Sequence, residues 1–138
     1  MILIDTPVWS LALRRKPENL SPRELRLKKL WYEIVDDGRA QLLGSVRQEL
    51  LSGLREESQF YRLRDYLRDF PDAPVTTGDY EEAARSSNRC RSAGIAASPV
   101  DMLICAIARR YDWEILTPDR DFAHYEKVLG IRLLAGPA

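Results

Sequence analysis

Short runs of strand-like residues alternate along the chain with longer segments of mixed polarity. The chain opens on the wholly apolar run 1–4, which is typical of a central strand buried on both faces. Runs at 40–43, 75–77, 114–117 and 131–134 predict further strands. Because segments with apolar residues at helical spacing separate these runs, the pattern predicts a three-layer α/β fold, in which a mostly parallel sheet lies between helices.

Polar residues that favour helix starts mark most of the intervening helices. Ser21 has Glu24 three residues later, a capping box that predicts a helix running to about Asp36. By the same rule, Ser45 and Asp79 are expected to cap two of the other helices. The remaining helices are expected after Asp5 and Thr6, across residues 56–70, across residues 98–110, and around His124 and Tyr125.

The segment 98–110 contains one acid in an otherwise apolar stretch. From Val100 to Ala108, every residue except Asp101 is apolar. The length of this stretch, its alanine content and its Ser-Pro start predict a helix that is buried on nearly all sides. Because burial of an unpaired carboxylate is costly, Asp101 is expected to face a polar or positive group.

Acidic residues occur where the predicted strands end. Asp5 follows the first strand, and Glu49 lies near the start of the helix after the second. Asp119 and Asp121 follow the fourth strand, and Asp101 opens the helix that leads into that strand. Ligand sites of parallel sheets lie outside the carboxyl ends of the strands, so we expect these acids to meet at one edge of the sheet.

Each of these acids has a structural explanation when taken alone, as a helix cap or as a partner of the helix dipole. Together they would repel one another unless a divalent cation neutralised them. Oxygen-only ligands suit Mg²⁺ or Mn²⁺, which also bind phosphates. A site of this kind activates water and stabilises the leaving oxygen of a phosphodiester.

The composition fits a single globular domain that spans residues 1–138. Asp5 interrupts the N-terminal apolar run and no apolar run reaches 18 residues, so neither a signal peptide nor a membrane span is expected. Cys90 and Cys105 lack metal-ligand spacing, which favours a reducing, cytoplasmic setting. The net charge is zero, but arginine supplies all basic side chains except four lysines, and its guanidinium group suits phosphate recognition. Nucleic acid therefore stays open as a ligand.

Four motifs of this chain resemble those of PIN-domain ribonucleases, and among these the VapC-type toxins of toxin–antitoxin systems. The motifs are residues 2–6 (ILIDT), 47–50 (RQEL), 101–106 (DMLICA) and 116–122 (LTPDRDF), which occur here in the family's order. The resemblance implies a PIN-like sheet of about five strands in the order 3-2-1-4-5. It also implies a Mg²⁺- or Mn²⁺-dependent endoribonuclease, whose metal-binding and catalytic residues are Asp5, Glu49, Asp101 and Asp119, with Asp121 as a lesser metal ligand.

Two threonines and four arginines complete the expected site. Thr6 and Thr117 are the supporting residues. Pro7 departs from the family, which often has Ser or Asn at this position, so Thr6 alone is expected to orient Asp5. The candidates for contacting RNA phosphates, which lie near the acids in sequence, are Arg14, Arg15, Arg47 and Arg120.

The resemblance also implies two partners, an RNA substrate and a cognate antitoxin protein, and the apolar helix faces that would bind the antitoxin could also form a homodimer. The amphipathic helices 23–36 and 56–70 could form a groove for an apolar partner helix. Their apolar residues are Leu27, Leu30, Trp31 and Ile34 on the first helix and Phe60, Leu63 and Leu67 on the second. In the family, an antitoxin tail fills such a groove and directs a basic side chain towards the metal site.

Two other classes of protein stay open. A receiver-like phosphoryl-acceptor domain also gathers acids at strand ends. That class requires an acidic pair after the first strand and a late lysine, whereas Asp5 stands alone and Lys127 lies within a predicted helix. The second alternative is a catalytically silent PIN fold that serves only as a binding module, against which the complete set of acids argues.

Overall fold

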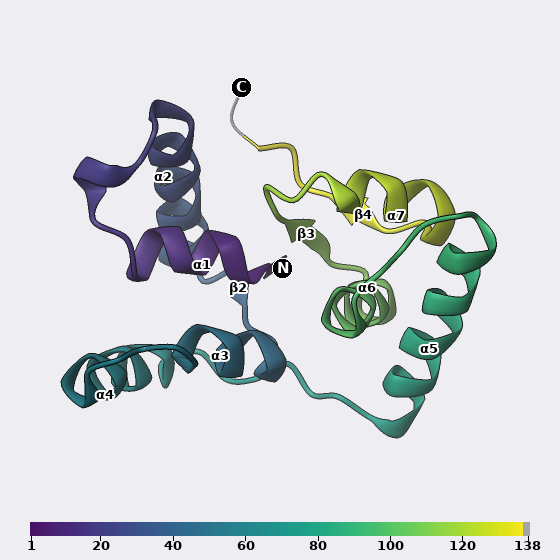
Figure 1. Ribbon diagram of the computed structural model, residues 1–138, viewed down its shortest axis with the longest axis horizontal. Coiled ribbons are helices and arrows are strands. Elements are labelled where there is room, and N and C mark those ends of the chain that lie inside the picture. The colour runs from purple at the N-terminus through teal and green to yellow at the C-terminus, as the bar shows by residue number, and fades with distance from the viewer. Residues whose placement is uncertain (137–138) are drawn as a thin grey trace.

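Short strands and helices alternate along the chain in the computed structural model, which describes residues 1–136 (Figure 1). The strands are β1 (Ile2–Ile4), β2 (Ala40–Gln41), β3 (Glu114–Leu116) and β4 (Arg132–Leu133). The helices are α1 (Thr6–Leu13), the 3₁₀ helix η1 (Pro17–Asn19), α2 (Pro22–Asp36), α3 (Gly44–Leu51), α4 (Glu57–Leu67), α5 (Thr77–Ser92), α6 (Pro99–Tyr111) and α7 (Asp121–Leu129). The α/β class predicted from the sequence is confirmed.

The strands form one parallel sheet in the order β2-β1-β3-β4. β1 is central, and its Ile2 pairs with Ala40 of β2 on one side and with Glu114 of β3 on the other. All three residues of β1 are buried, as expected of an apolar run covered on both faces. Because the strands run in the same direction, β1 and β3 end at the same edge of the sheet.

The strand expected at 75–77 does not form, so the prediction of a fifth strand was wrong. Pro74 has no N–H to donate to a sheet, and Thr76 instead becomes the N-cap of α5. This segment reaches the sheet through a single bridge at Leu42, whose carbonyl accepts from the Ala73 N–H at 2.9 Å. The predicted order of the other four strands is confirmed.

Helices cover both sides of the sheet. Figure 1 shows α1 to α4 on one side of the molecule and α5 to α7 on the other, with the strands between them. On the first side, the buried Trp9 of α1 packs edge-on against Trp31 and Phe70. On the other side, α6 is buried from Met102 to Ala108, as its sequence predicted. Within residues 1–136, the structure contains no helix of the length and apolar character that a membrane crossing requires.

The capping predictions were right for one helix and wrong for two. Ser21 and Glu24 form the predicted capping box at the start of α2. Ser45 lies inside α3, which begins without a side-chain cap, and its buried hydroxyl has no hydrogen-bond partner within residues 1–136. Asp79 is the fourth residue of a capping box whose N-cap is Thr76, because Thr76 precedes it at the required spacing.

Candidate active site

Asp5 is the buried acid at the edge of the sheet where β1 and β3 end. It is 5% exposed and caps the N-terminus of α1, where its Oδ1 accepts from the Thr6 N–H at 2.8 Å. Its Oδ2 accepts from the Thr117 hydroxyl at 2.9 Å, and its own N–H donates to the Leu116 carbonyl at 3.0 Å. The carboxylate is therefore held from both sides, by the start of α1 and by the end of β3.

The environment of Asp5 favours its protonated form. Burial raises the pKa of Asp5 from its ordinary value of 3.8 to about 6, and the nearby carboxylates of Asp101 and Asp119 add to this rise. The hydrogen bonds from Thr117 and Thr6 act in the opposite direction but are outweighed. The charges of Asp101 and Asp119 therefore act on Asp5, as acids near one edge of the sheet would.

Asp101 lies in the first turn of α6, where its N–H donates to the N-cap Ser98 at 3.1 Å. Its Oδ2 accepts from the hydroxyl of Tyr125 in α7 at 3.0 Å, so the expected polar partner is present. Burial raises the pKa of Asp101, and the charges of Asp119 and Asp121 add to the effect. Tyr125 was not among the predicted site residues. It lies one helical turn after Asp121 in the sequence, but that spacing alone does not specify its bond to Asp101.

Glu49 extends from α3 as an exposed acid of the same region. Its Oε2 accepts from the Thr6 hydroxyl at 2.7 Å. The side chain of Thr6 therefore orients Glu49, while its backbone N–H reaches Asp5. The prediction that Thr6 alone orients Asp5 was wrong, because the hydroxyl on the Asp5 carboxylate comes from Thr117.

Asp119 lies in the turn between β3 and α7, Asp121 is the first residue of α7, and both are exposed. The Asp119 N–H donates to the Thr117 hydroxyl oxygen at 3.0 Å. The Asp119 Oδ1 in turn accepts from the Asp121 N–H at 2.9 Å. Thr117 therefore connects the buried Asp5 to Asp119 and, through Asp119, to the start of α7.

The chemistry of these donors fits a hard divalent cation. The carboxylates come from four separate elements, and burial and mutual repulsion disfavour the charged forms of two of them, Asp5 and Asp101. A cation would relieve that repulsion, and carboxylate oxygens are the ligands that Mg²⁺ and Mn²⁺ prefer. Within residues 1–136, no three His, Cys, Asp or Glu side chains are already drawn together as a metal-binding group.

The four candidate arginines differ in how their guanidinium groups are used. Arg15 pairs with Glu24 and also donates to the Asn19 carbonyl at 3.0 Å. Arg47 donates to Asp72 at 2.8 Å and to two backbone carbonyls, those of Leu67 and Phe70, so it ties α3 to the end of α4. Arg14 and Arg120 have exposed side chains.

A hollow of about 420 Å³ lies beside the loop that carries Asp119. Its lining includes Pro118 and Arg120 from that loop, together with residues of α1 and α2. Arg15 and Arg23 also line it, so three guanidinium groups and one acid, Glu24, surround the space. A basic hollow next to an acidic cluster suits an extended phosphate chain, because local charge steers ligands more than net charge does.

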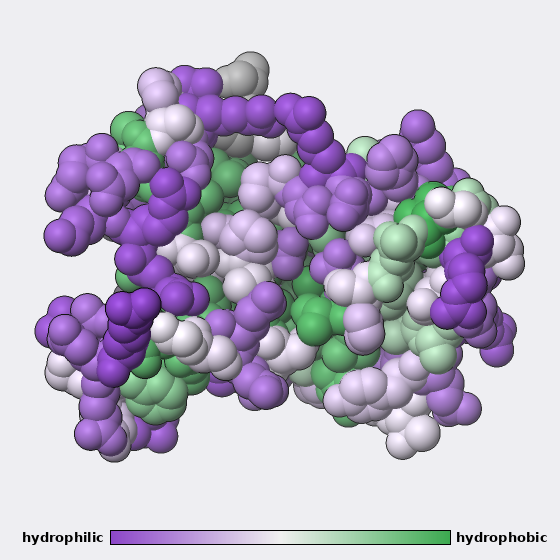
Figure 2. Space-filling view, in the orientation of Figure 1, coloured by the Kyte–Doolittle hydropathy of each residue, from purple (hydrophilic) through white to green (hydrophobic). Residues whose placement is uncertain are grey.

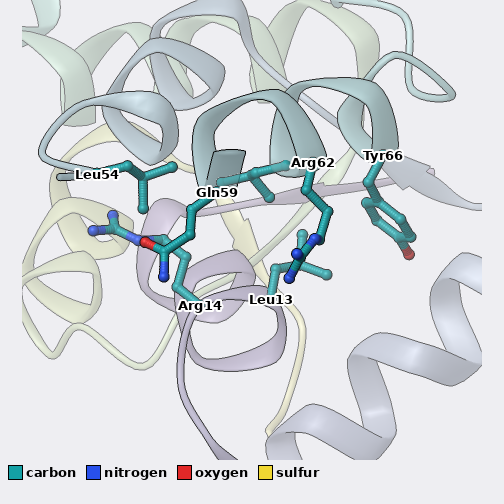
Figure 3. A pocket seen from close by; sticks show the side chains of 7 residues that line it. Leu13, Arg14, Leu54, Gln59, Arg62 and Tyr66 are labelled. Atoms are coloured by element: carbon teal, nitrogen blue, oxygen red, sulfur yellow. The ribbon is translucent and has the colours of Figure 1, made fainter. Parts of the chain in front are cut away.

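A second hollow, which we call the α1–α4 groove, lies between the end of α1 and α4 and has a volume of about 430 Å³. Figure 2 shows the surface indented between the part of the molecule formed by α1 and α2 and the part formed by α4. In Figure 3, Leu13 at the end of α1 and Arg14 directly after it face Arg62 and Tyr66 of α4, with Leu54 at one end. The groove combines apolar walls with guanidinium groups.

The fold and these acids define a class of protein, an α/β domain with carboxylates at the carboxyl edge of a parallel sheet. The family model described as PIN domain matches residues 2–128, and the chain belongs to the PIN domain family. This confirms the family that the four sequence motifs indicated. PIN domains are typically nucleases and are generally metal-dependent.

Solved structures share the fold at low sequence identity. A chain of the crystal structure of FitAcB from Neisseria gonorrhoeae matches with a TM-score of 0.73 at 19% identity, covering 98% of this chain and 97% of that one. A chain of VapBC2 from Rickettsia felis, in a structure with a DNA fragment from the VapBC2 promoter, matches with a TM-score of 0.71 at 14% sequence identity. The match covers 97% of this chain and 98% of that one. A chain of the structure of FitAB bound to an IR36 DNA fragment matches with a TM-score of 0.74 at 19% sequence identity. The match covers 97% of this chain and 94% of that one. No curated protein matches the chain.

Proposed function

We propose that the chain is a metal-dependent endoribonuclease that acts as the toxin of a toxin–antitoxin pair. The observation that carries the proposal is the buried Asp5 carboxylate, which interacts with the charges of Asp101 and Asp119. Such a cluster is unfavourable without a cation, which supports a role for a bound cation in the function of the protein. Membership of the PIN family supports the same conclusion, because PIN domains are typically nucleases.

The chain's own hydroxyl groups position the acids in this proposal. The residues that would hold Mg²⁺ or Mn²⁺ are Asp5, Glu49, Asp101 and Asp119, with Asp121 as a lesser contributor. When bound, the cation supplies the charge that activates water and stabilises the leaving oxygen of the phosphodiester. The Thr117 hydroxyl holds the carboxylate of Asp5, and the Thr6 hydroxyl holds that of Glu49. Both acids are therefore oriented before a cation binds, and binding does not have to order them.

The basic hollow beside Asp119 is the proposed path of the RNA backbone. Arg120 is exposed and lines the hollow, and Arg15 lines it as well although it pairs with Glu24. Arg14 is exposed but lines the α1–α4 groove instead. Arg47 is less suited to this role, because its guanidinium group already donates to three protein acceptors. Guanidinium forks match phosphate oxygens in pairs, which favours RNA over a small neutral substrate.

The α1–α4 groove is the proposed seat of the antitoxin. It differs from the groove expected from the sequence: Leu27, Trp31, Ile34 and Leu67 are buried in the protein's own core, and of the expected apolar residues only Leu63 lines the α1–α4 groove. The α1–α4 groove has apolar side chains for the apolar face of a partner helix and guanidinium groups for its acids. Chains from the structures of FitAB and of VapBC2 have the same fold, which supports a two-protein assembly here.

The proposed homodimer uses another surface. An apolar hollow of about 370 Å³ between α5 and α6 is lined by Tyr80, Val100 and Met102, and Tyr80 is 60% exposed. This hollow is on the opposite side of the molecule from the α1–α4 groove, so a dimer and an antitoxin can be accommodated together (Figure 1). Sedimentation at micromolar concentration measures the dimer directly.

The test of the proposed function is cleavage of end-labelled RNA by the purified chain with Mg²⁺, with Mn²⁺ and with EDTA. We expect cleavage only with a cation, and a loss of at least about 100-fold when Asp5→Asn and Asp119→Asn are combined. Asp112→Asn is the matched control, because Asp112 is an exposed acid that pairs with Arg132 away from the site. Cleavage that persists in EDTA or in the double variant would overturn the proposal. RNA binding without cleavage would favour the silent binding module.

A further inference from the structure

Tyr125 is a buried side chain that reaches the acidic site from α7. Only 1% of the residue is exposed, and its ring packs edge-on against Phe122 at a centroid distance of 5.0 Å. Its hydroxyl donates to Oδ2 of Asp101 at 3.0 Å. Phenylalanine would fill the same volume, so packing alone does not account for the hydroxyl group.

The hydrogen bond from Tyr125 completes a pattern in the site. Three of its acids each receive a hydroxyl hydrogen bond on one carboxylate oxygen, and each donor belongs to a different segment. The pairs are Thr117 with Asp5, Thr6 with Glu49, and Tyr125 with Asp101. A carboxylate held by a hydroxyl has one orientation before a ligand arrives, which lowers the entropy lost on binding.

We propose that Tyr125 is a positioning residue, whose hydroxyl orients the Asp101 carboxylate for a divalent cation. This proposal rests on the proposed function. Asp101 belongs to α6, whereas Tyr125 belongs to the helix that begins at Asp121. The bond therefore also fixes the position of α7, and of the turn with Asp119 that precedes it, relative to Asp101. Removal of such an outer partner of a metal ligand weakens metal affinity by about 10- to 100-fold in other proteins.

The test measures Mn²⁺ affinity by calorimetry for the full chain and for Tyr125→Phe. The variant keeps the buried ring and removes only the hydroxyl. We expect Mn²⁺ to bind the variant about 10-fold more weakly or worse. Thermal unfolding in EDTA reports the stability of the metal-free fold separately, so a purely structural role is distinguishable from a positioning role.

Tyr111→Phe is the matched control. The Tyr111 hydroxyl also forms a hydrogen bond, to the Pro74 carbonyl at 3.2 Å, but that bond joins the end of α6 to the segment before α5. We expect this control to leave Mn²⁺ affinity unchanged. In the Asp101→Asn background, Tyr125→Phe should have little further effect, because the carboxylate that it orients has been removed.

The outcomes separate the two proposals. Equal Mn²⁺ affinity of the wild type and Tyr125→Phe would overturn the role of Tyr125 and leave the metal site intact. A variant that loses only stability in EDTA would overturn it as well. If Tyr125→Phe does not fold, Mn²⁺ titration of Tyr125→Met replaces it, because methionine also fills a buried apolar space without a hydroxyl group. Affinity about 10-fold weaker than that of the wild type supports positioning, and affinity equal to that of the wild type refutes it. A wild type that binds no Mn²⁺ would refute the proposed function itself.

Discussion

Thr117 shows how one side chain can organise several acids at once. Its hydroxyl donates to the buried Asp5 and accepts from the N–H of Asp119, so the two acids are connected through a single oxygen atom. Asp5 is 5% exposed, and solvent therefore offers its Oδ2 little replacement for a lost hydrogen bond. Thr117, predicted as a supporting residue, therefore acts by a hydrogen bond to each of two acids.

Replacing Thr117 by Val keeps the shape of the side chain and removes the hydroxyl. We expect the free energy of unfolding to fall by about 1–3 kcal/mol, because a buried carboxylate oxygen loses its partner. Urea denaturation in EDTA measures the change. Thr77→Val is the control, since Thr77 is exposed in the first turn of α5, and its effect should stay within about 0.5 kcal/mol. Equal effects of the two substitutions would contradict the assigned contact.

Asp5 should make stability depend on pH in a particular direction. Its pKa is raised to about 6 in the folded state from 3.8, so between these values the native state keeps a proton that the unfolded state has released. Stability in EDTA should therefore fall as pH rises from about 4 to about 7, by up to about 3 kcal/mol for this group. In Asp5→Asn this contribution is absent, so the stability of the variant relative to the wild type should increase as the pH rises over that range.

The measurement is urea denaturation of both proteins at several pH values, and its readout is the difference between them. Glu24 and Asp79 have lowered pKa values, which makes their contributions oppose that of Asp5 in acid. Because both residues are present in the wild type and in the variant, their contributions cancel in the difference. A difference that is constant across the range would show that Asp5 titrates normally in the folded chain.

At the scale of elements, the starts of three helices show when a local capping pattern suffices and when the surrounding fold overrides it. The capping box of α2 forms as predicted, since Ser21 and Glu24 satisfy each other without help from the rest of the fold. At α3 the same pattern fails, because the chain enters the helix at Gly44 directly from the sheet and carries Ser45 past the cap position. At α5, Thr76 competes with Asp79 for the cap and occupies it.

Two serine-to-alanine variants test this distinction. Ser21→Ala should lower the free energy of unfolding by about 1 kcal/mol, because the start of α2 loses its cap. Ser45→Ala should be neutral or slightly stabilising, since it removes a buried hydroxyl that has no partner within residues 1–136. Thermal denaturation compares them directly. A loss at Ser45 as large as that at Ser21 would restore Ser45 as a cap.

At the scale of the whole molecule, the α1–α4 groove can be tested by placing a charge in its apolar wall. Leu54→Glu should weaken binding of an acidic, apolar partner helix, because the new carboxylate enters an apolar wall of the groove. The measurement is neutralisation of growth arrest when the neighbouring gene is co-expressed. Leu25→Glu is the control, since Leu25 is 43% exposed on α2 outside the lining of the groove. Full neutralisation of Leu54→Glu would place the partner elsewhere.

The sequence by itself determined the order of the elements and the class of the fold. Apolar runs for β1 and β3, and the nearly unbroken apolar stretch around Asp101, report burial directly because their periodicity is local. The positions of the acids after strands and at helix starts also follow from the chain, since parallel strands that end at one edge bring such residues towards one another. These features need no knowledge of long-range contacts.

Only the tertiary structure decided which group holds which acid. Asp5 and Thr117 are 112 positions apart, and the Tyr125 hydroxyl reaches Asp101 from another helix, so no local pattern specifies these bonds. The tertiary structure likewise committed Leu27 and Trp31 to the protein's own core and left the α1–α4 groove open. The physical reason is the same in each case: helical spacing shows that a face is apolar, but packing against the other elements decides what covers it.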